Sequence, residues 1–194
     1  FVHDRQRGDG RRRLHRRLNL REIMNNANRI AVVGTGLVGR AWSIVFARAG
    51  HDTVMYDPVE GAAQSARETI AEGLPDLSDA GLLGGCTPEE VAARLTVASS
   101  LDEALEGALH VQESAPERVD VKRILFADLD RITAPETVLA SSTSGIPASQ
   151  LTEELSGRRR SWLPTPSIRP TSSRWWRSFP LPGPIRRPLH ARES

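Results

Sequence analysis

Apolar and polar residues follow two periods in turn along residues 29–155, and their order predicts a sheet covered by helices. Short apolar runs, which suit buried strands, alternate with longer stretches of helical periodicity, which suit helices packed on a sheet. This pattern is typical of an α/β fold with a doubly wound, mostly parallel, Rossmann-like sheet. We expect strands at residues 29–33, 52–56, 95–97, 109–113 and 138–140.

The helices are expected between these strands. The first ends at Gly50, and the second ends before residues 73–85, a segment that Pro75 and several glycines interrupt. The last long helix carries an apolar stripe with Ile124 beside it, as a helix lying on a sheet should. We expect helices at residues 37–49, 59–72, 88–94, 117–132 and 147–155, with a further one that begins after Ser100.

The loop between the first strand and the first helix has the sequence Gly-Thr-Gly-Leu-Val-Gly. In a dinucleotide-binding turn, Gly34 makes the tight turn, Gly36 lets the backbone approach a diphosphate, and Gly39 lets the helix pack close to the strand. The amide groups of the first helical turn, at Leu37 and Val38, then point at the diphosphate. The loop therefore predicts a dinucleotide site.

Asp57 follows the second predicted strand, where such folds place the carboxylate that binds the adenosine ribose hydroxyls. A carboxylate at this position favours NAD over NADP, because a 2′-phosphate would meet a like charge. The alternative is an ordinary strand-to-helix turn in which Asp57 is a solvated cap or turn residue. We expect NAD as the cofactor, because strand, glycine loop, helix, strand and acid occur together in this order.

Charge is unevenly distributed in this chain of 194 residues, which is long enough for one domain of ordinary size. Residues 1–29 hold nine Arg and three acidic residues, residues 30–156 hold eight basic and twenty acidic residues, and residues 157–194 hold nine Arg and one acidic residue. The basic ends leave open a noncatalytic nucleotide-binding module whose Arg-rich tails contact nucleic acid. We expect no nucleic-acid partner, because no stacking platform or recognition helix accompanies the Arg clusters.

Cys86 is the only cysteine, so the chain can form no internal disulfide. This fits a reducing compartment, and we expect a cytoplasmic protein in which Cys86 is a packed or loop thiol rather than a nucleophile. No apolar stretch approaches the roughly twenty residues of a membrane span, so no membrane partner is expected. We assign no metal ligands.

Four parts of the sequence together resemble the NAD-binding domain of the 3-hydroxyacyl-CoA dehydrogenase superfamily. They are the glycine loop with its flanking strands, the run Gln-Glu-Ser-Ala-Pro-Glu that ends at Glu117, the only lysine, Lys122, and the serine-rich loop of residues 141–145. The second and fourth parts look closest to the L-gulonate 3-dehydrogenase, or lambda-crystallin, branch. The resemblance covers about residues 28–157. It implies that residues 34–39 bind the diphosphate, that Asp57 binds the adenosine ribose, and that Glu117 and Lys122 bind the cofactor further along.

The resemblance implies hydride transfer between NAD and the 3-hydroxy carbon of a small-molecule substrate. That substrate is a 3-hydroxyacyl-CoA or a small, L-gulonate-like 3-hydroxy acid, and Ser142 with the run at residues 112–114 favours the hydroxy acid. Ser144 matches the family serine that hydrogen-bonds the reacting oxygen, and Ser142 is placed close to the nicotinamide. As bare loop residues both would be turn residues, and Lys122 would be a solvated helix lysine, so these roles rest on the resemblance.

The general acid/base of the family is a His in a His-Pro-x-Asn-Pro segment, held by a Glu, and this segment is expected soon after Gly157. The printed sequence lacks it. The histidines present lie in other contexts, and His110, at a strand start, is expected to be structural. We therefore expect a catalytically incomplete chain, without the helical C-terminal domain through which full-length homologues form homodimers. The sheet edge after residue 140 would be left uncovered.

Three segments follow from these arguments: a disordered basic leader over residues 1–23, an NAD-binding Rossmann domain over residues 24–157, and a disordered tail over residues 158–194. A shift of the reading frame explains the sequence of the tail. The family-like peptide Ala-His-Pro-Ile-Asn-Pro-Pro-Tyr-Leu-Ile-Pro-Val-Val-Glu-Val-Val-Pro can be encoded so that reading it one base later produces residues 164–180 of this chain. We interpret the tail as out-of-frame translation that begins between residues 157 and 162.

Sequencing the gene across these codons tests the interpretation. We expect a single-base change of frame, with the His-Pro-Ile-Asn-Pro peptide encoded in the neighbouring frame. A neighbouring frame without that peptide would rule out the out-of-frame tail.

Overall fold

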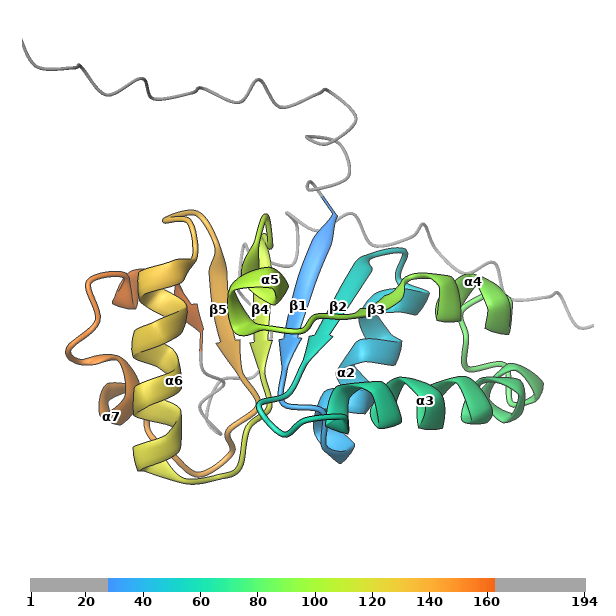
Figure 1. The fold of residues 1–194 in the computed structure, drawn as a ribbon, viewed down its shortest axis with the longest axis horizontal. Coiled ribbons are helices and arrows are strands. Elements are labelled where there is room, and N and C mark those ends of the chain that lie inside the picture. The colour runs from blue at the N-terminus through green and yellow to red at the C-terminus, as the bar shows by residue number, and fades with distance from the viewer. Residues whose placement is uncertain (1–27, 163–194) are drawn as a thin grey trace, which may run out of the picture.

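The computed structural model describes residues 28–162, which form a six-stranded sheet covered by helices (Figure 1). Neighbouring strands are all parallel, in the order β3-β2-β1-β4-β5-β6. This is the strand order of the doubly wound Rossmann arrangement, and it confirms the predicted fold class. The strands are β1 (Arg29–Val33), β2 (Asp52–Tyr56), β3 (Leu95–Val97), β4 (His110–Glu113), β5 (Val138–Ser141) and β6 (Ser161–Trp162).

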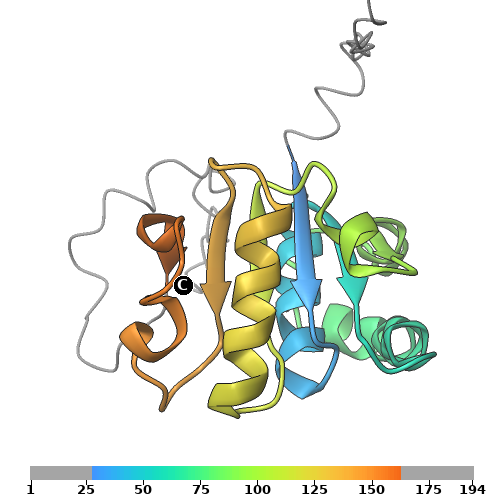
Figure 2. The same cartoon turned by 60° about the vertical axis from the view of Figure 1, so that its left-hand side comes forward.

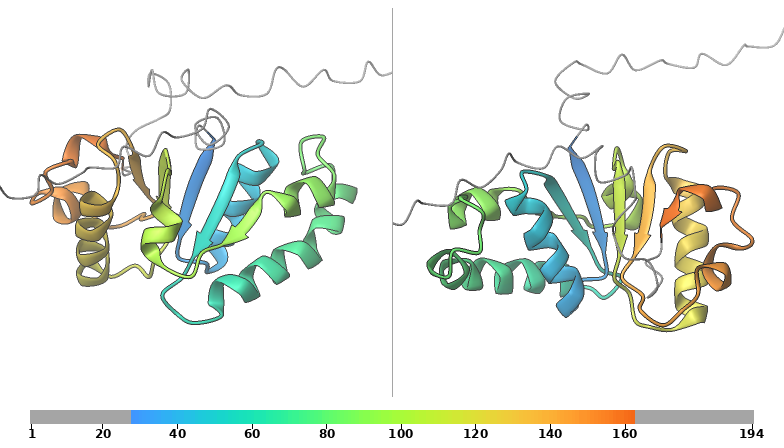
Figure 3. Two further views of the ribbon diagram at one scale, coloured as in Figure 1. Left: turned by 45° about the horizontal axis from the view of Figure 1, so that its top comes forward. Right: turned by 180° about the vertical axis from the view of Figure 1, so that it is seen from behind.

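Helices cover both faces of the sheet. They are α2 (Leu37–Arg48), α3 (Ala62–Asp79), α4 (Pro88–Ala93), α5 (Leu101–Leu105), α6 (Val119–Ile132) and α7 (Ala148–Thr152). Figure 3 shows α2 on the face opposite α6, while α6 and α7 lie side by side (Figure 2). One buried cluster joins Val33 and Val111 of the sheet to α5, α6 and α7, and a second joins Met55 to α2, α3 and α4.

Helix α3 differs from the prediction of a helix over residues 59–72. It starts later, because Gly61 before it has a φ of +76°, and it continues to Asp79 with Pro75 inside it. A proline removes one backbone hydrogen bond, but Leu74 beside it is only 1% exposed and packs in the second buried cluster. Burial of the stripe Ala63, Ala66, Ile70 and Leu74 thus outweighs the helix-breaking tendency of proline.

The buried face of α6 also differs in part from the predicted one. Ile124 is 69% exposed, whereas Lys122, Phe126 and Leu129 are buried against the sheet. The polar Lys122 occupies a core-facing position because the carboxylates of Glu113 and Glu117 lie next to its ammonium group. A search for apolar stripes cannot detect such a residue. Two helices are shorter than expected: α6 begins at Val119, and the last helix spans only residues 148–152.

Residues that follow the predicted domain boundary at residue 157 take part in the sheet. A 3-10 turn of residues 158–160 leads into β6, which pairs with β5 and covers the edge that was expected to be open. Arg160 holds this segment against α6, with its Nη2 2.7 Å from Oδ1 of Asp130 and both side chains largely buried. The three consecutive arginines had been assigned to a basic tail. The predicted leader of residues 1–23 and the tail beyond residue 162 lie outside the described residues.

His110 opens β4 as a buried side chain, 4% exposed, with its ring 5.5 Å from that of Phe46. Burial lowers the pKa of His110 to about 4, from 6.5 for a solvated histidine. As the pH falls, the unfolded chain therefore takes up the proton first. The stability that the neutral ring contributes is complete above pH 6.5 and is lost as the pH falls toward 4.

Replacement of His110 by Gln is expected to remove this pH dependence. Between pH 7 and pH 5 the native protein should lose about 2 kcal/mol more unfolding free energy than H110Q, from 1.5 pH units at about 1.36 kcal/mol each. Urea unfolding of both proteins at the two pH values measures the difference, because the carboxylates are present in both proteins and cancel. Equal losses in the two proteins would show that His110 is not buried in its neutral form.

Candidate functional site

The predicted site residues gather at the carboxyl edge of the sheet, around the switch in strand order between β1 and β4. The chain moves outward from β1 through β2 to β3 and then returns to continue from β4. Open α/β folds bind ligands at such a switch point. Two backbone hydrogen bonds hold the loops there, from Gly34 N to Tyr56 O at 2.9 Å and from Ser114 N to Val33 O at 2.7 Å.

Two of the three loop glycines are required by the protein's own backbone. Gly34 has a φ of +93°, and a Cβ there would lie 2.6 Å from the carbonyl oxygen of Ser114. A Cβ on Gly39 would lie 1.9 Å from the carbonyl oxygen of Gly34. The glycine loop, the start of α2 and the loop after β4 can therefore come this close only without side chains at these positions.

Gly36 is exposed, and a Cβ there would meet nothing within 4 Å. Packing within the protein thus gives no reason for a glycine, whereas a ligand lying against the backbone would. Gly36 is also the N-cap of α2, and no side chain in the described part of the chain caps this end. The first turn of α2 contains no acidic residue, and Leu37 and Val38 are 77% and 49% exposed. Open amides at a helix N-terminus suit a diphosphate.

Asp57 faces the glycine loop, as a ribose-binding acid should. Its Oδ2 accepts hydrogen bonds from the backbone N–H of Thr35 at 2.8 Å and from the Thr35 hydroxyl at 3.0 Å, and its Oδ1 accepts one from Val59 N at 3.0 Å. A carboxylate has roughly four acceptor positions, so one is left for a ligand hydroxyl. Thr35, which is buried and fixes this acid, was missed because its place between two glycines carries no sequence signal of its own.

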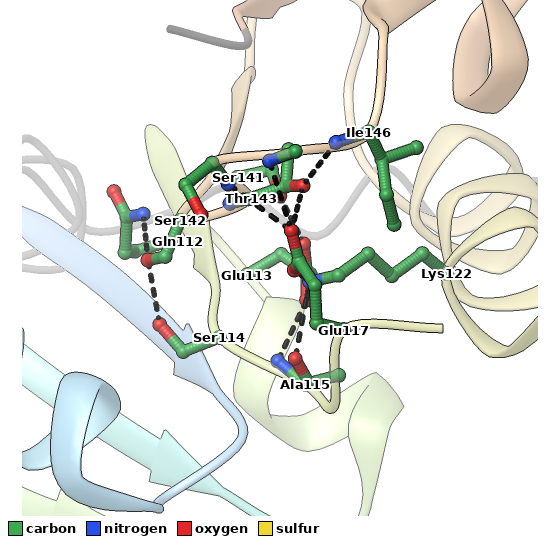
Figure 4. A network of polar contacts seen from close by, with 12 residues as sticks. Gln112, Glu113, Ser114, Ala115, Glu117, Lys122, Ser141, Ser142, Thr143 and Ile146 are labelled. Atoms are coloured by element: carbon green, nitrogen blue, oxygen red, sulfur yellow. Dashed lines mark hydrogen bonds and ion pairs between the residues drawn. The ribbon is translucent and has the colours of Figure 1, made fainter. Parts of the chain in front are cut away.

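Lys122 forms a buried ion pair beneath the site. Its Nζ lies 2.6 Å from Oε1 of Glu113, 3.1 Å from the carbonyl oxygen of Ala115 and 3.5 Å from Oε2 of Glu117. The side chains of Lys122 and Glu113 are 1% and 0% exposed. An ammonium has three N–H donors, and three protein acceptors surround this one (Figure 4). The ammonium group of Lys122 therefore faces acceptors of the protein itself.

Glu117 and Glu113 connect this ion pair to the loop after β5 (Figure 4). Oε1 of Glu117 accepts hydrogen bonds from the Thr143 hydroxyl and from the backbone N–H groups of Ser144 and Gly145, at 3.1 and 3.2 Å. Partial burial raises the pKa of Glu117, but these bonds and the charge of Lys122 outweigh it and lower the pKa. Glu113 accepts a hydrogen bond from the Ser141 hydroxyl. Ser144, predicted to be catalytic, is exposed at the rim of this loop.

Ser142 belongs to a separate hydrogen-bonded group. Its hydroxyl oxygen accepts a bond from Nε2 of Gln112 at 2.9 Å and lies 2.9 Å from that of Ser114. The two predicted serines thus sit in one loop but in different polar surroundings. Gln112, Ser114 and Thr143 were not predicted as site residues, because their roles depend on contacts between the ends of β4 and β5.

Residues 28–162 contain neither a metal-binding cluster nor a membrane-spanning helix. No group of three or more His, Cys, Asp or Glu side chains is placed to hold a metal ion. No helix in this part of the chain is long and apolar enough to cross a membrane.

Comparison with known proteins agrees with this geometry. Residues 29–163 match the family model described as 3-hydroxyacyl-CoA dehydrogenase, NAD binding domain. The chain is 44% identical over 129 residues to an L-carnitine dehydrogenase of Streptomyces griseus, an alignment that covers 66% of this chain and 37% of the relative. It is 38% identical over 126 residues to the lambda-crystallin of Oryctolagus cuniculus, covering 64% of this chain and 40% of the relative.

A solved structure also resembles this one. The 3-hydroxybutyryl-CoA dehydrogenase of Escherichia coli K12 superposes with a TM-score of 0.65 at 32% identity, over 70% of this chain and 29% of that chain. The chain thus spans about two fifths of the length of the curated relatives named above. The match to the family model extends over more than half of the sequence and includes the glycine loop, Asp57 and the buried ion pair. This chain belongs to the 3-hydroxyacyl-CoA dehydrogenase family and carries its NAD-binding domain.

Proposed function

We propose that this chain is the cofactor-binding part of an NAD-dependent oxidoreductase that acts on the 3-hydroxy carbon of a small-molecule substrate. The observation that carries the proposal is the open backbone at Gly36 beside the carboxylate of Asp57. A diphosphate on the amides of Leu37, Val38 and Gly39 would be followed by a ribose within reach of the remaining acceptor position of Asp57.

When bound, NAD accepts a hydride from the carbon that carries the hydroxyl group. The residues of this chain bind and orient. Glu117 holds the backbone of Ser144 and Gly145 in place, so that the exposed Ser144 hydroxyl can hydrogen-bond the reacting oxygen, and Ser142 stands near the nicotinamide. Lys122 is proposed to support cofactor binding through Glu117, because its ammonium is enclosed by protein acceptors.

The substrate class that we favour is a small 3-hydroxy acid rather than a 3-hydroxyacyl-CoA. L-carnitine, the substrate in the name of the Streptomyces relative, is itself a 3-hydroxy acid. Ser142 and its hydrogen bond to Gln112 belong to the same part of the site. We further propose a cytoplasmic enzyme whose full-length homologues are homodimers.

We infer that the chain as printed binds NAD without turning over substrate. No residue of the described site is placed as the general base, and the sequence lacks the His-Pro-x-Asn-Pro segment that the family resemblance implies. We propose an out-of-frame origin for the residues that follow β6. It follows that NAD binding, and not catalysis, is the activity to measure on this chain.

Asp57→Asn tests the cofactor assignment. NAD should bind the variant about ten- to a hundredfold more weakly, because a hydrogen bond to a charged group contributes about 1.5–3 kcal/mol. NADP should not weaken in the same way, since the repulsion between the Asp57 carboxylate and a 2′-phosphate is lost. Calorimetric titration of the full chain with each nucleotide measures both affinities.

Asp52→Asn is the matched control, because Asp52 is an exposed acid at the other end of the same strand. It removes the same charge away from the site and should leave both affinities unchanged. If the folded native chain binds neither nucleotide, the proposed function is wrong.

Lys122→Met should destabilise the fold by about 3–5 kcal/mol, because it leaves the buried carboxylate of Glu113 without its partner. Arg123→Met removes a neighbouring cation whose partner, Glu154, is exposed, and it should change stability little. Urea unfolding compares the variants with the native protein. The double variant K122M/E113Q should recover part of the loss, and a loss no larger than that of R123M would contradict the buried pair.

A further inference from the structure

The buried side chain of Gln112 lies directly beneath two serine hydroxyls of the site. Gln112 is 3% exposed, on the face of β4 that it shares with His110 and Ser114. Its Oε1 lies 3.3 Å from Nε2 of His110, and its Nε2 donates to the hydroxyl oxygen of Ser142 at 2.9 Å. An amide oxygen can only accept, so the contact with His110 requires the tautomer with its proton on Nε2. In this arrangement the amide turns its oxygen to His110 and its N–H to Ser142.

The amide in turn restricts the protons of the serine pair. The hydroxyl oxygens of Ser142 and Ser114 lie 2.9 Å apart, so one of their two protons is used between them. The donated N–H of Gln112 prevents Ser142 from turning its own proton inward. One O–H donor of the pair is therefore left to point away from Gln112, toward the end of the sheet.

The position of Ser114 places this donor at the cofactor site. A Cβ built on Gly39 would lie 3.5 Å from Cβ of Ser114, and one on Gly34 would meet the Ser114 backbone. Ser142 comes from the next strand outward, β5, on the side of the glycine loop opposite to Asp57. In a dinucleotide that crosses the switch point with its adenosine ribose at Asp57, the nicotinamide half lies on the side of β4 and β5. Figure 4 shows Gln112, Ser114 and Ser142 joined in one chain of hydrogen bonds.

We propose that Gln112 is a positioning residue which, through Ser142, orients a hydroxyl donor toward a hydrogen-bond acceptor on the nicotinamide half of NAD. This inference rests on the proposed function and adds to it the residue that sets the direction of the donor. Gln112 acts without touching the ligand, because its side chain is buried beneath Ser142.

The test compares two nucleotides on the full chain. NADH contains the nicotinamide half, and ADP lacks it, so only NADH can respond to the serine pair. Gln112→Met keeps the size of the side chain and removes the N–H donor. It should weaken NADH binding about three- to tenfold, the effect of one hydrogen bond, and leave ADP binding unchanged. Gln150→Met, the same change at an exposed position of α7, is the matched control and should alter neither affinity.

A double-mutant cycle separates positioning from a general effect on the fold. Ser142→Ala should weaken NADH binding by a similar factor, and adding Q112M to S142A should have little further effect, because Gln112 acts through Ser142. Equal losses of NADH and ADP affinity in Q112M, or full additivity in the double variant, would overturn the proposal. If Q112M does not fold, S142A still tests the donor on which the proposal depends: unchanged NADH affinity, or an equal loss of ADP affinity, overturns the proposal. Failure of the native chain to bind either nucleotide would instead refute the proposed function.

Discussion

The close approach of the glycine loop to the loop after β4 is the constraint on which the rest of the site depends. Gly34 and Gly39 permit it, because any side chain at either position would overlap backbone atoms of Ser114 or of the glycine loop itself. The approach seats the start of α2 against the switch point and turns its uncapped amides toward the sheet edge. Gly36 then remains as open backbone, which is the form that a diphosphate needs.

Polar groups in the interior hold the other half of the site. Lys122, Glu113 and Glu117 connect the loop after β4, the start of α6 and the loop after β5. Burying these charges is costly, and the cost is offset because the ammonium donates two hydrogen bonds and lies beside a second carboxylate. The same arrangement holds the Ser144 backbone in place. A rigid rim is what a hydride-transfer site requires, since the reacting carbon must be placed closely against the cofactor.

The L-carnitine dehydrogenase and the 3-hydroxybutyryl-CoA dehydrogenase differ in the substrates that their names state, yet this chain is similar to both. In the proposed binding mode the adenosine side rests on backbone geometry and one acid, whereas the nicotinamide side rests on side-chain hydrogen bonds at the ends of β4 and β5. Backbone geometry tolerates changes in most side chains, while the hydroxyl and amide groups around Ser142 can vary with the ligand. We therefore propose that substrate choice depends on the second group and on the parts of the relatives that this chain does not span.

The sequence by itself determined the order of strands and helices, the glycine loop and the position of Asp57, because each depends on local periodicity or on a short motif. Only the tertiary structure decided that α3 runs through Pro75, since burial of Leu74 against distant strands outweighs a local preference. It likewise decided that Lys122 is enclosed and that residues 158–162 join the sheet, through Arg160 and Asp130. Neither ion pair leaves a periodic signal in the sequence, so each becomes visible only once the fold brings its partners together.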